Sequence, residues 1–433
     1  MINTIKNIIT NNKNIDGYKI TEEKIQSNEL FLVKKSIDMD RAKDVHHFKI
    51  VIYKDVEEDS IKYRGAATIN IYPTMSEREI EFAINEAVFA AEFAKNPYYP
   101  LVKNSDLYKK NNESNFSSED LPHWINEITK AVYKNDIYED GGINSCEIFL
   151  NKVYTRIINS EGVDVQGLNY KCMVEYIPTW KGENEEVELY RCLNFSSFDP
   201  SFIAEDVESM INICKERAVA IKTPNLEKIP VILTKDAVSK FFSFYTSKSN
   251  AASIYNKQST WKIGDKLQGD NVLGDAISIK LDPFISNSTK STFFDEDGFP
   301  LEAVIIIENG VLKNYIASNR YAYYLNVKAT GNINNVIVSC GSKTIDELKE
   351  EAYLEIAAFS DFTVDTLTGN FGGEIRLAWY FDGSKVIPVT GGSISGNIME
   401  LQKELYLSKE LQRDNNFIGP KAIKLINVTI STE

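Results

Sequence analysis

Histidine, the side chain that most often serves as a catalytic base or a zinc ligand, is nearly absent from this chain. The three histidines are His46, His47 and His123. His46 and His47 are adjacent in an expected strand, where neighbouring side chains point to opposite faces, so they cannot easily share one metal ion. No histidine follows residue 123, which excludes a helical H-E-x-x-H zinc site from the C-terminal half. A Ser-His-Asp or Cys-His arrangement would have to use one of these three.

The cysteines favour neither a disulfide framework nor a cysteine-rich zinc site. Their number is odd, their spacing is wide, and no C-x-x-C occurs. This usage is typical of a protein from a reducing cytoplasm. A buried thiol is the expected state of Cys340, because no base lies near it in the sequence. The five cysteines are Cys146, Cys172, Cys192, Cys214 and Cys340.

Two other patterns could do chemistry, and each has a simpler structural interpretation. The run Asp295-Glu296-Asp297-Gly298 offers three carboxylates, which are ligands for magnesium or calcium, but an acidic turn at the surface is the favoured interpretation. Glycine-rich segments at 368–373 and 391–396 match neither a dinucleotide fingerprint nor a P-loop. Their glycines allow either a close approach of another backbone or ordinary turns.

The helix that we expect near Asp236 to Tyr245 carries an aromatic stripe. Such a stripe packs in a core more often than it binds a ligand. Its apolar residues are Val238, Phe241, Phe242, Phe244 and Tyr245.

These residues must be positioned by a mixture of strands and helices. The N-terminal half contains β-branched and aromatic runs followed by helices at Glu77 onward, Leu121–Asn135 and about Pro200–Ala220. The C-terminal half is mostly strands with glycine-containing turns, interrupted by a helix expected over Ile345–Ile356. Strand blocks with occasional helices, lacking regular βαβ alternation, predict an α+β fold whose C-terminal half is mostly antiparallel.

A composition shift at Lys222-Thr223-Pro224 divides the chain into two predicted domains. Residues 1–222 form an N-terminal α+β domain, and residues 223–433 form a C-terminal β-rich domain. Within the first, sub-blocks at about 16–100 and 120–222 repeat the order of strands and then a helix, which suggests a structural duplication.

The charge of the chain argues against two classes of partner. Lys and Arg number 48 against 62 Asp and Glu, a net charge of −14. Such a protein is poorly suited to hold nucleic acid or anionic lipid by nonspecific charge, although a locally basic groove is compatible with it. The N-terminus lacks the apolar core of a signal peptide, and no segment is apolar enough to span a membrane. We therefore expect a soluble, cytoplasmic protein.

Ordered phrases along the chain resemble the TldD/PmbA family of cytoplasmic bacterial peptidases, once described as modulators of DNA gyrase. The resemblance extends from about residue 16 to the C-terminus. In order, the phrases are GAATINIY before a long helix, Asn159-Ser160-Glu161-Gly162, Leu281-Asp282-Pro283, DEDGFP, ENGVLKNYIASNRYAYYL, Thr330-Gly331-Asn332, Thr368-Gly369-Asn370-Phe371 and PVTGGSISGNIMEL.

The resemblance implies one half of a two-component zinc peptidase. In that family one subunit type carries an H-E-x-x-x-H motif on a helix early in the C-terminal half and a cysteine ligand near the C-terminus. The other, the PmbA/TldE type, lacks these ligands and completes the peptide-binding chamber. Here the matching helix reads SKFFSFY from Ser239 to Tyr245, and no cysteine follows Cys340. The chain therefore resembles the PmbA/TldE type, and no catalytic or metal-binding residue is carried over.

The same resemblance implies a zinc-bearing TldD-type partner, no cofactor in this chain itself, and unfolded peptides as substrates. Glycine-lined backbone and strand edges would hold an extended peptide by β-augmentation. The Tyr245 helix either packs as core or presents Tyr245 to the partner, and a homodimer stays open for the isolated chain. The candidate contacts to substrate or partner are Tyr245, Asn370, Phe371, Gly372 and Gly373.

Two alternatives remain from the sequence alone. The first is a self-sufficient peptidase or hydrolase of the same family with unrecognised ligands, which would be active without a partner. The second is a peptide-binding scaffold without protease activity, which would form tight complexes lacking any zinc subunit.

Overall fold

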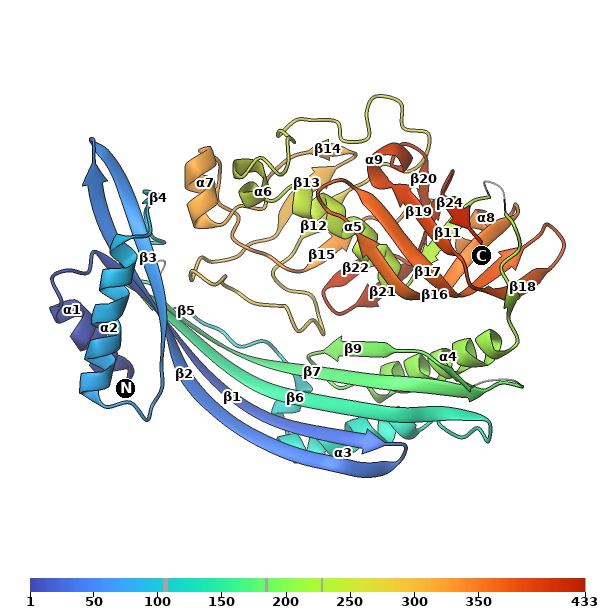
Figure 1. The fold of residues 1–433 in the computed structure, drawn as a ribbon, viewed down its shortest axis with the longest axis horizontal. Coiled ribbons are helices and arrows are strands. Elements are labelled where there is room, and N and C mark those ends of the chain that lie inside the picture. The colour runs from blue at the N-terminus through green and yellow to red at the C-terminus, as the bar shows by residue number, and fades with distance from the viewer. Residues whose placement is uncertain (104–107, 184–185, 227–228, 433) are drawn as a thin grey trace.

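A computed structural model describes residues 1–103, 108–183, 186–226 and 229–432. The chain begins with a large curved sheet and continues into a second half that lies over it (Figure 1). Among the described residues, no helix is long and apolar enough to cross a membrane.

The N-terminal sheet is built on four long antiparallel strands. These are β1 (Gly17–Val33), β2 (Ser36–Glu58), β6 (Gly141–Asn159) and β7 (Asp164–Lys181). The order is β4-β3-β2-β1-β6-β7-β5, and β8 and β9 also pair with β7. The shorter strands are β3 (Ile61–Ile71), β4 (Asn96–Pro97), β5 (Tyr108–Lys109), β8 (Glu186–Glu188) and β9 (Arg191–Phe195).

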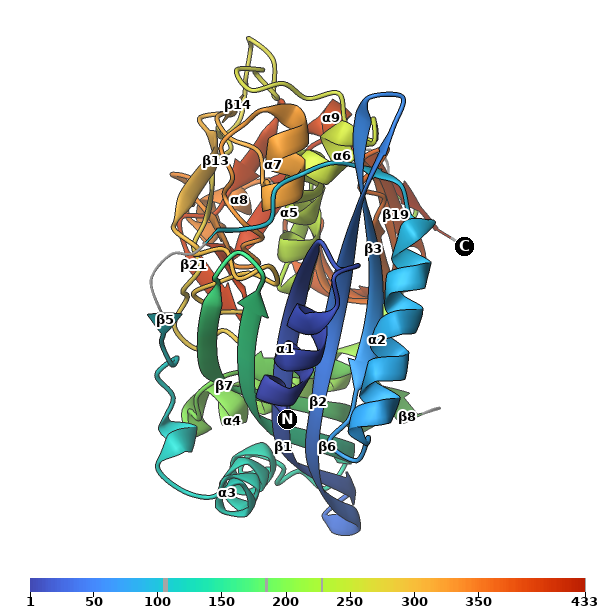
Figure 2. The same cartoon turned by 90° about the vertical axis from the view of Figure 1, so that its left-hand side faces the viewer.

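Helices cover one face of this sheet. Helix α1 (Ile2–Asn11) and helix α2 (Glu77–Glu92) pack against β1 and β2 through a common apolar cluster (Figure 2). Helix α3 (Leu121–Tyr133) and helix α4 (Pro200–Ala218) pack against β6 and β7. Because strand side chains alternate between faces, the other face is left for the polar residues between those apolar ones. A short 3-10 helix covers Asn115–Ser117.

The C-terminal half contains two further sheets around helix α5 (Asp236–Lys248). Nine described strands form one, in the order β10-β18-β17-β16-β11-β23-β20, with β19 on β17 and β24 on β19. They are β10 (Ile221–Lys222), β11 (Val231–Thr234), β16 (Tyr353–Val364), β17 (Asn370–Phe381), β18 (Val386–Thr390), β19 (Ser393–Asn397), β20 (Leu405–Leu407), β23 (Ala422–Leu425) and β24 (Thr429–Ser431).

The other C-terminal sheet has the order β14-β13-β12-β15-β22-β21. Its strands are β12 (Ile279–Leu281), β13 (Val304–Glu308), β14 (Val311–Leu312), β15 (Val336–Val338), β21 (Leu411–Asp414) and β22 (Phe417–Pro420). One apolar core joins α5 to strands of both sheets. The remaining helices are α6 (Ala251–Tyr255), α7 (Asn319–Leu325), α8 (Ile345–Leu348) and α9 (Ile398–Leu401).

The predicted α+β class is confirmed, with mostly antiparallel pairing and a strand-rich C-terminal half. The helix predicted over Ile345–Ile356 is wrong beyond its first turn. Helix α8 ends at Leu348, and the following residues enter β16, which pairs parallel with β11 and antiparallel with β17. Burial between two neighbouring strands outweighs the helical spacing of these apolar residues.

The two N-terminal sub-blocks share one sheet, because β1 pairs with β6 along fifteen consecutive positions from Lys19 to Val33. Near the predicted boundary at residue 222, β10 already pairs with β18 of the C-terminal half. The division into domains at 222/223 stays a prediction.

Candidate functional site

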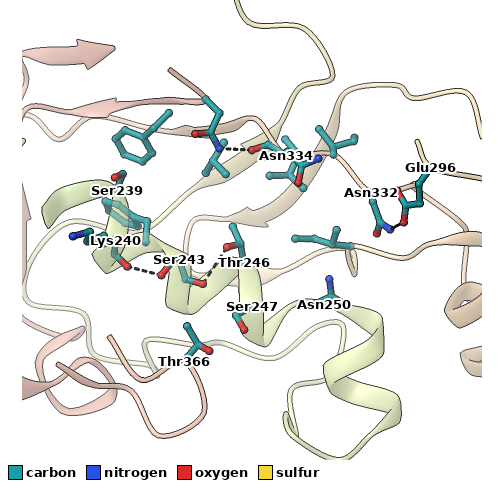
Figure 3. A pocket seen from close by; sticks show the side chains of 17 residues that line it. Ser239, Lys240, Ser243, Thr246, Ser247, Asn250, Glu296, Asn332, Asn334 and Thr366 are labelled. Carbon is teal, nitrogen blue, oxygen red and sulfur yellow. Dashed lines mark hydrogen bonds between the residues drawn. The ribbon is translucent and has the colours of Figure 1, made fainter. Parts of the chain in front are cut away.

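Helix α5 has one apolar and one polar face. The apolar face enters the core. On the other face, side chains at spacings of three and four line a cleft of about 720 Å³ (Figure 3). The polar-face residues that line the cleft are Ser239, Lys240, Ser243, Thr246 and Ser247, and Phe242 of the apolar face also borders it.

The hydroxyls of this polar face have their protons directed into the helix. Ser239 Oγ donates to the carbonyl of Asp236 at 2.9 Å, and Ser243 Oγ donates to that of Lys240 at 2.6 Å. Thr246 Oγ1 donates to the carbonyl of Ser243 at 3.1 Å. Since a hydroxyl has one proton and two lone pairs, each oxygen can still accept a hydrogen bond from a ligand N–H group.

The opposite wall of the cleft carries side-chain amides. Asn416 Nδ2 donates to the Asn334 carbonyl at 2.7 Å, and Asn332 Nδ2 donates to the Glu296 carboxylate. In the described part of the chain, no three His, Cys, Asp or Glu side chains gather as they would to hold a metal ion. The residues present do not fit zinc, and the cleft is suited to hydrogen bonding with a polar chain.

Tyr245 lies on the apolar face of α5, turned away from the cleft. Its side chain is fully buried, and its hydroxyl donates to Gln402 Oε1 at 3.1 Å. Burial raises the pKa of Tyr245. Within this chain the aromatic stripe therefore packs as core, the first of the two alternatives for this helix.

The segment Asn370–Gly373 belongs to β17 and does not line this cleft. Phe371 is buried against Phe241, with ring centroids 6.1 Å apart. A β-carbon at Gly373 would lie 2.6 Å from Phe359 Cδ1, so the close approach that the glycine permits is to the chain's own side chain. Asn370 is exposed and accepts from Asn397 Nδ2 at 2.8 Å. A contact of this segment with substrate or partner stays a prediction.

The acidic run is a turn at the rim of the cleft, but its first carboxylate is buried, which the surface interpretation missed. Asp295 Oδ1 accepts the backbone N–H groups of Asp297 and Phe299 at 2.9 and 3.0 Å. Burial, and then the neighbouring Asp297 and Glu296 carboxylates, raise the pKa of Asp295 to about 7. Lys19 of β1 pairs with Asp297 at 2.5 Å, so the turn ties the N-terminal sheet to the C-terminal half.

Two further clefts adjoin the first. One, of about 600 Å³, shares Ser239, Lys240, Asn416 and Phe417 with it, and the other, of about 570 Å³, shares Glu296 and Asn334. The first cleft is lined by the C-terminal half alone, whereas the other two are lined by residues of both halves and adjoin the first through these shared residues.

The sequence analysis missed Lys235, which lines the 600 Å³ cleft just before α5. It has φ 55° and ψ −132°, an unusual backbone conformation for a residue with a side chain. Burial and then the Arg191 cation lower the pKa of Lys235 to about 8. Arg191 is itself held by Asp206, with Nη2 to Oδ2 at 2.8 Å. No local sequence signal indicates these residues, because they meet only in the fold.

Comparisons with known proteins point to one family. Residues 226–432 match the family model described as PmbA/TldA metallopeptidase C-terminal domain. A metalloprotease of Methanocaldococcus jannaschii is 24% identical over 367 residues, covering 78% of each chain. The metalloprotease PmbA of Escherichia coli O157:H7 is 26% identical over 200 residues, 44% of each chain. The crystal structure of TldE from Thermococcus kodakarensis has a similar fold, with a TM-score of 0.81, 18% identity, and coverage of 99% of this chain and 100% of that one.

Proposed function

Because the chain belongs to the TldD/PmbA metallopeptidase family, we propose that it is the non-catalytic subunit of a two-component zinc peptidase. In this proposal it works in the cytoplasm beside a zinc-bearing, TldD-type partner. It completes the chamber in which unfolded peptides are held for cleavage.

The observation that carries this proposal is the polar face of α5. The family resemblance leads us to expect zinc ligands on this helix in a catalytic subunit, whereas here Ser239, Lys240 and Ser243 face the cleft. Lys240 is paired within the helix to Asp236, with Nζ to Oδ2 at 3.2 Å. A face of hydroxyls and one paired lysine supplies neither a metal site nor a general base.

The same face can still position a peptide. An extended peptide presents backbone N–H groups that need acceptors, and the hydroxyl oxygens of Ser243 and Thr246 are available for that purpose. Holding the peptide in the correct orientation relative to the attacking group lowers much of the activation barrier for its cleavage. The zinc of the partner would polarise the scissile carbonyl and activate a water, while this chain holds the substrate and excludes solvent.

Assembly and cleavage test the proposal separately. The chain is mixed with a zinc-bearing family member, and the complex is followed by size-exclusion chromatography and by cleavage of an unstructured peptide. We expect coelution and cleavage by the mixture. Cleavage by this chain alone would favour the self-sufficient hydrolase, and coelution without cleavage would favour the scaffold.

A variant with a bulky side chain in the cleft along α5 tests the role of that cleft directly. Ser243→Trp should occupy the cleft and lower the cleavage rate by about tenfold or more while coelution persists, since binding geometry is lost and assembly is not. Ser209→Trp is the matched control, because Ser209 is an exposed serine on α4 that lines none of the three clefts. Equal activity of the two variants would refute a role for the cleft.

A further inference from the structure

One face of the N-terminal sheet carries a basic groove. It coincides with the cleft of about 570 Å³ and is lined by side chains at every second position of β1, β2 and β7. Thr21 and Lys49 lie opposite each other in register, while their neighbours Ile20 and Ile50 point to the opposite face, under α1 and α2. We call this surface the lysine groove, and its basic side chains are Lys19, His47, Lys49, Lys110, Lys171 and Lys290.

Several of these lysines have no acidic counterpart. Among the residues that the structure describes, Lys49, Lys171 and Lys290 form no ion pair within 4.0 Å. Burial and then the Lys290 cation lower the pKa of Lys171, and the Glu23 carboxylate partly offsets them. Both lysines line one hollow, so an anion between the two cations would be stabilised by both.

The acidic side chains that line the groove are already engaged. Glu23 pairs with His47 at 3.2 Å, and Glu296 accepts from Asn332. Asp295 is buried beneath backbone N–H groups. The lining holds five lysines against the three carboxylates of Glu23, Asp295 and Glu296, so the groove presents net positive charge on a chain whose total charge is −14.

The lysines are spread along the groove, which fixes the shape of the ligand. Thr21 of β1 lies opposite Lys49 of β2 on one side and opposite Ile157 of β6 on the other. Ile157 in turn lies opposite Val165 of β7, and Lys171 follows Val165 by six residues along β7. Three strand spacings across and six residues along put Lys49 and Lys171 roughly 25 Å apart, the length of about seven extended residues. Lysines at this separation match carboxylates distributed along an extended chain better than a single small anion.

We propose that the lysine groove binds acidic, extended peptide segments and leads them toward the cleft along α5. The groove and that cleft share Glu296 and Asn334, so a chain can pass from one to the other. The inference rests on the proposed function, because it names the class of peptide that the proposed chamber would bind. We favour an acidic peptide over a nucleic acid as the ligand. The net charge of the chain is −14, so its surface outside the groove repels a long, continuous polyanion.

Peptide binding by the isolated full-length chain tests the inference. Fluorescein-labelled peptides of alternating serine with glutamate, with glutamine or with lysine, each about eight residues long to span the groove, are titrated by fluorescence anisotropy at low and high salt. We expect the glutamate peptide to bind, its affinity to fall with salt, and the other two to bind more weakly by about tenfold or more.

Charge reversal locates the site. Lys171→Glu/Lys290→Glu should weaken binding of the glutamate peptide by about tenfold or more. The control Lys6→Glu/Lys13→Glu makes the same charge change at exposed positions near α1, on the opposite face of the sheet, and should bind like the parent chain. Circular dichroism establishes that each variant is folded. If the Lys171/Lys290 variant does not fold, Lys49→Gln provides the same test with a smaller loss.

Equal affinity for the three peptides, or equal loss in the groove and control variants, would overturn the inference. Tighter binding of an oligothymidylate than of the glutamate peptide, lost in the groove variant, would also overturn it in favour of nucleic acid. Because this assay needs no partner and no cleavage, it can succeed where assembly with a zinc subunit fails. Conversely, an active complex without preference for acidic peptides would refute this inference and leave the proposed function standing.

Discussion

Replacing Asp295 with asparagine should change how the stability of the protein depends on pH. Burial and the neighbouring carboxylates raise the pKa of Asp295 from 3.8 to about 7 in the folded chain. The unfolded chain ionises near pH 4, while the folded chain holds the proton up to about pH 7. The contribution of Asp295 to the free energy of unfolding is therefore greatest below about pH 4 and falls between pH 4 and 7. Above pH 7 this contribution no longer changes with pH. A shift of about three units corresponds to about 4 kcal/mol.

Asparagine has no such titration but loses part of the hydrogen bonding. Its oxygen can still accept from the backbone of Asp297 and Phe299, whereas its NH₂ group would meet the Asn332 N–H that now donates to Asp295 Oδ2 at 3.3 Å. This loss costs about 1 kcal/mol. Asp295→Asn should accordingly be about 1 kcal/mol less stable than the parent near pH 4 and about 3 kcal/mol more stable near pH 8.

Urea denaturation of both proteins between pH 4 and pH 8.5, followed by tryptophan fluorescence, measures this difference. The predicted curves cross as the pH rises. A constant difference across the range would refute the raised pKa of the buried carboxyl and, with it, our account of the turn.

Four further substitutions test the packing in the C-terminal half. Gly373→Val should destabilise the chain by about 2 kcal/mol or more in thermal unfolding, because its β-carbon would lie 2.6 Å from Phe359, whereas Gly372→Ala should cost less, since its nearest neighbour lies at 3.3 Å. Tyr245→Phe should cost about 1 kcal/mol in urea by leaving Gln402 without its donor, and should leave coelution with a zinc subunit unchanged. Lys235→Gly should stabilise the chain by about 1 kcal/mol by relieving the positive φ. It should also abolish a rise in stability between about pH 8 and 10.5, because the folded pKa of Lys235 lies below its unfolded value.

Helix boundaries were predictable where local signals fixed them. Ser76 and Glu79 form the capping box that begins α2, and Asp199 with Pro200 begins α4. The prediction of a helix over Ile345–Ile356 was wrong in its length. Thr344 does cap a helix, but that helix, α8, has a single turn. Strand pairing then decides the following residues, and no local signal reports that pairing.

The lengths of the N-terminal strands could not be predicted from composition. Residues Ser36–Val45 of β2 are exposed, with apolar side chains such as Ile37 and Met39 among them, and they are held in the strand by pairing with β1. The turn between β1 and β2 places Lys34 at φ 53°. The length of β2 therefore depends on hairpin pairing with β1, which the composition of β2 does not report.

The candidate site was predictable in part. The position of α5 and its apolar stripe followed from spacing, and Tyr245 lies in the core that this stripe forms. The lysine groove was not predictable, because Lys49, Lys171 and Lys290 come from a strand, another strand and a loop that meet only in the fold. The charge of −14 left room for such a groove without locating it.

The most direct test of the central claim is peptide cleavage measured on this chain, on a zinc-bearing family member, and on their mixture, with the zinc content of each determined by elemental analysis. The account predicts no stoichiometric zinc in this chain, little cleavage by either protein alone, and cleavage by the mixture that a chelator abolishes. About one tightly held zinc per molecule of this chain, or full activity of the zinc subunit without it, would contradict the account.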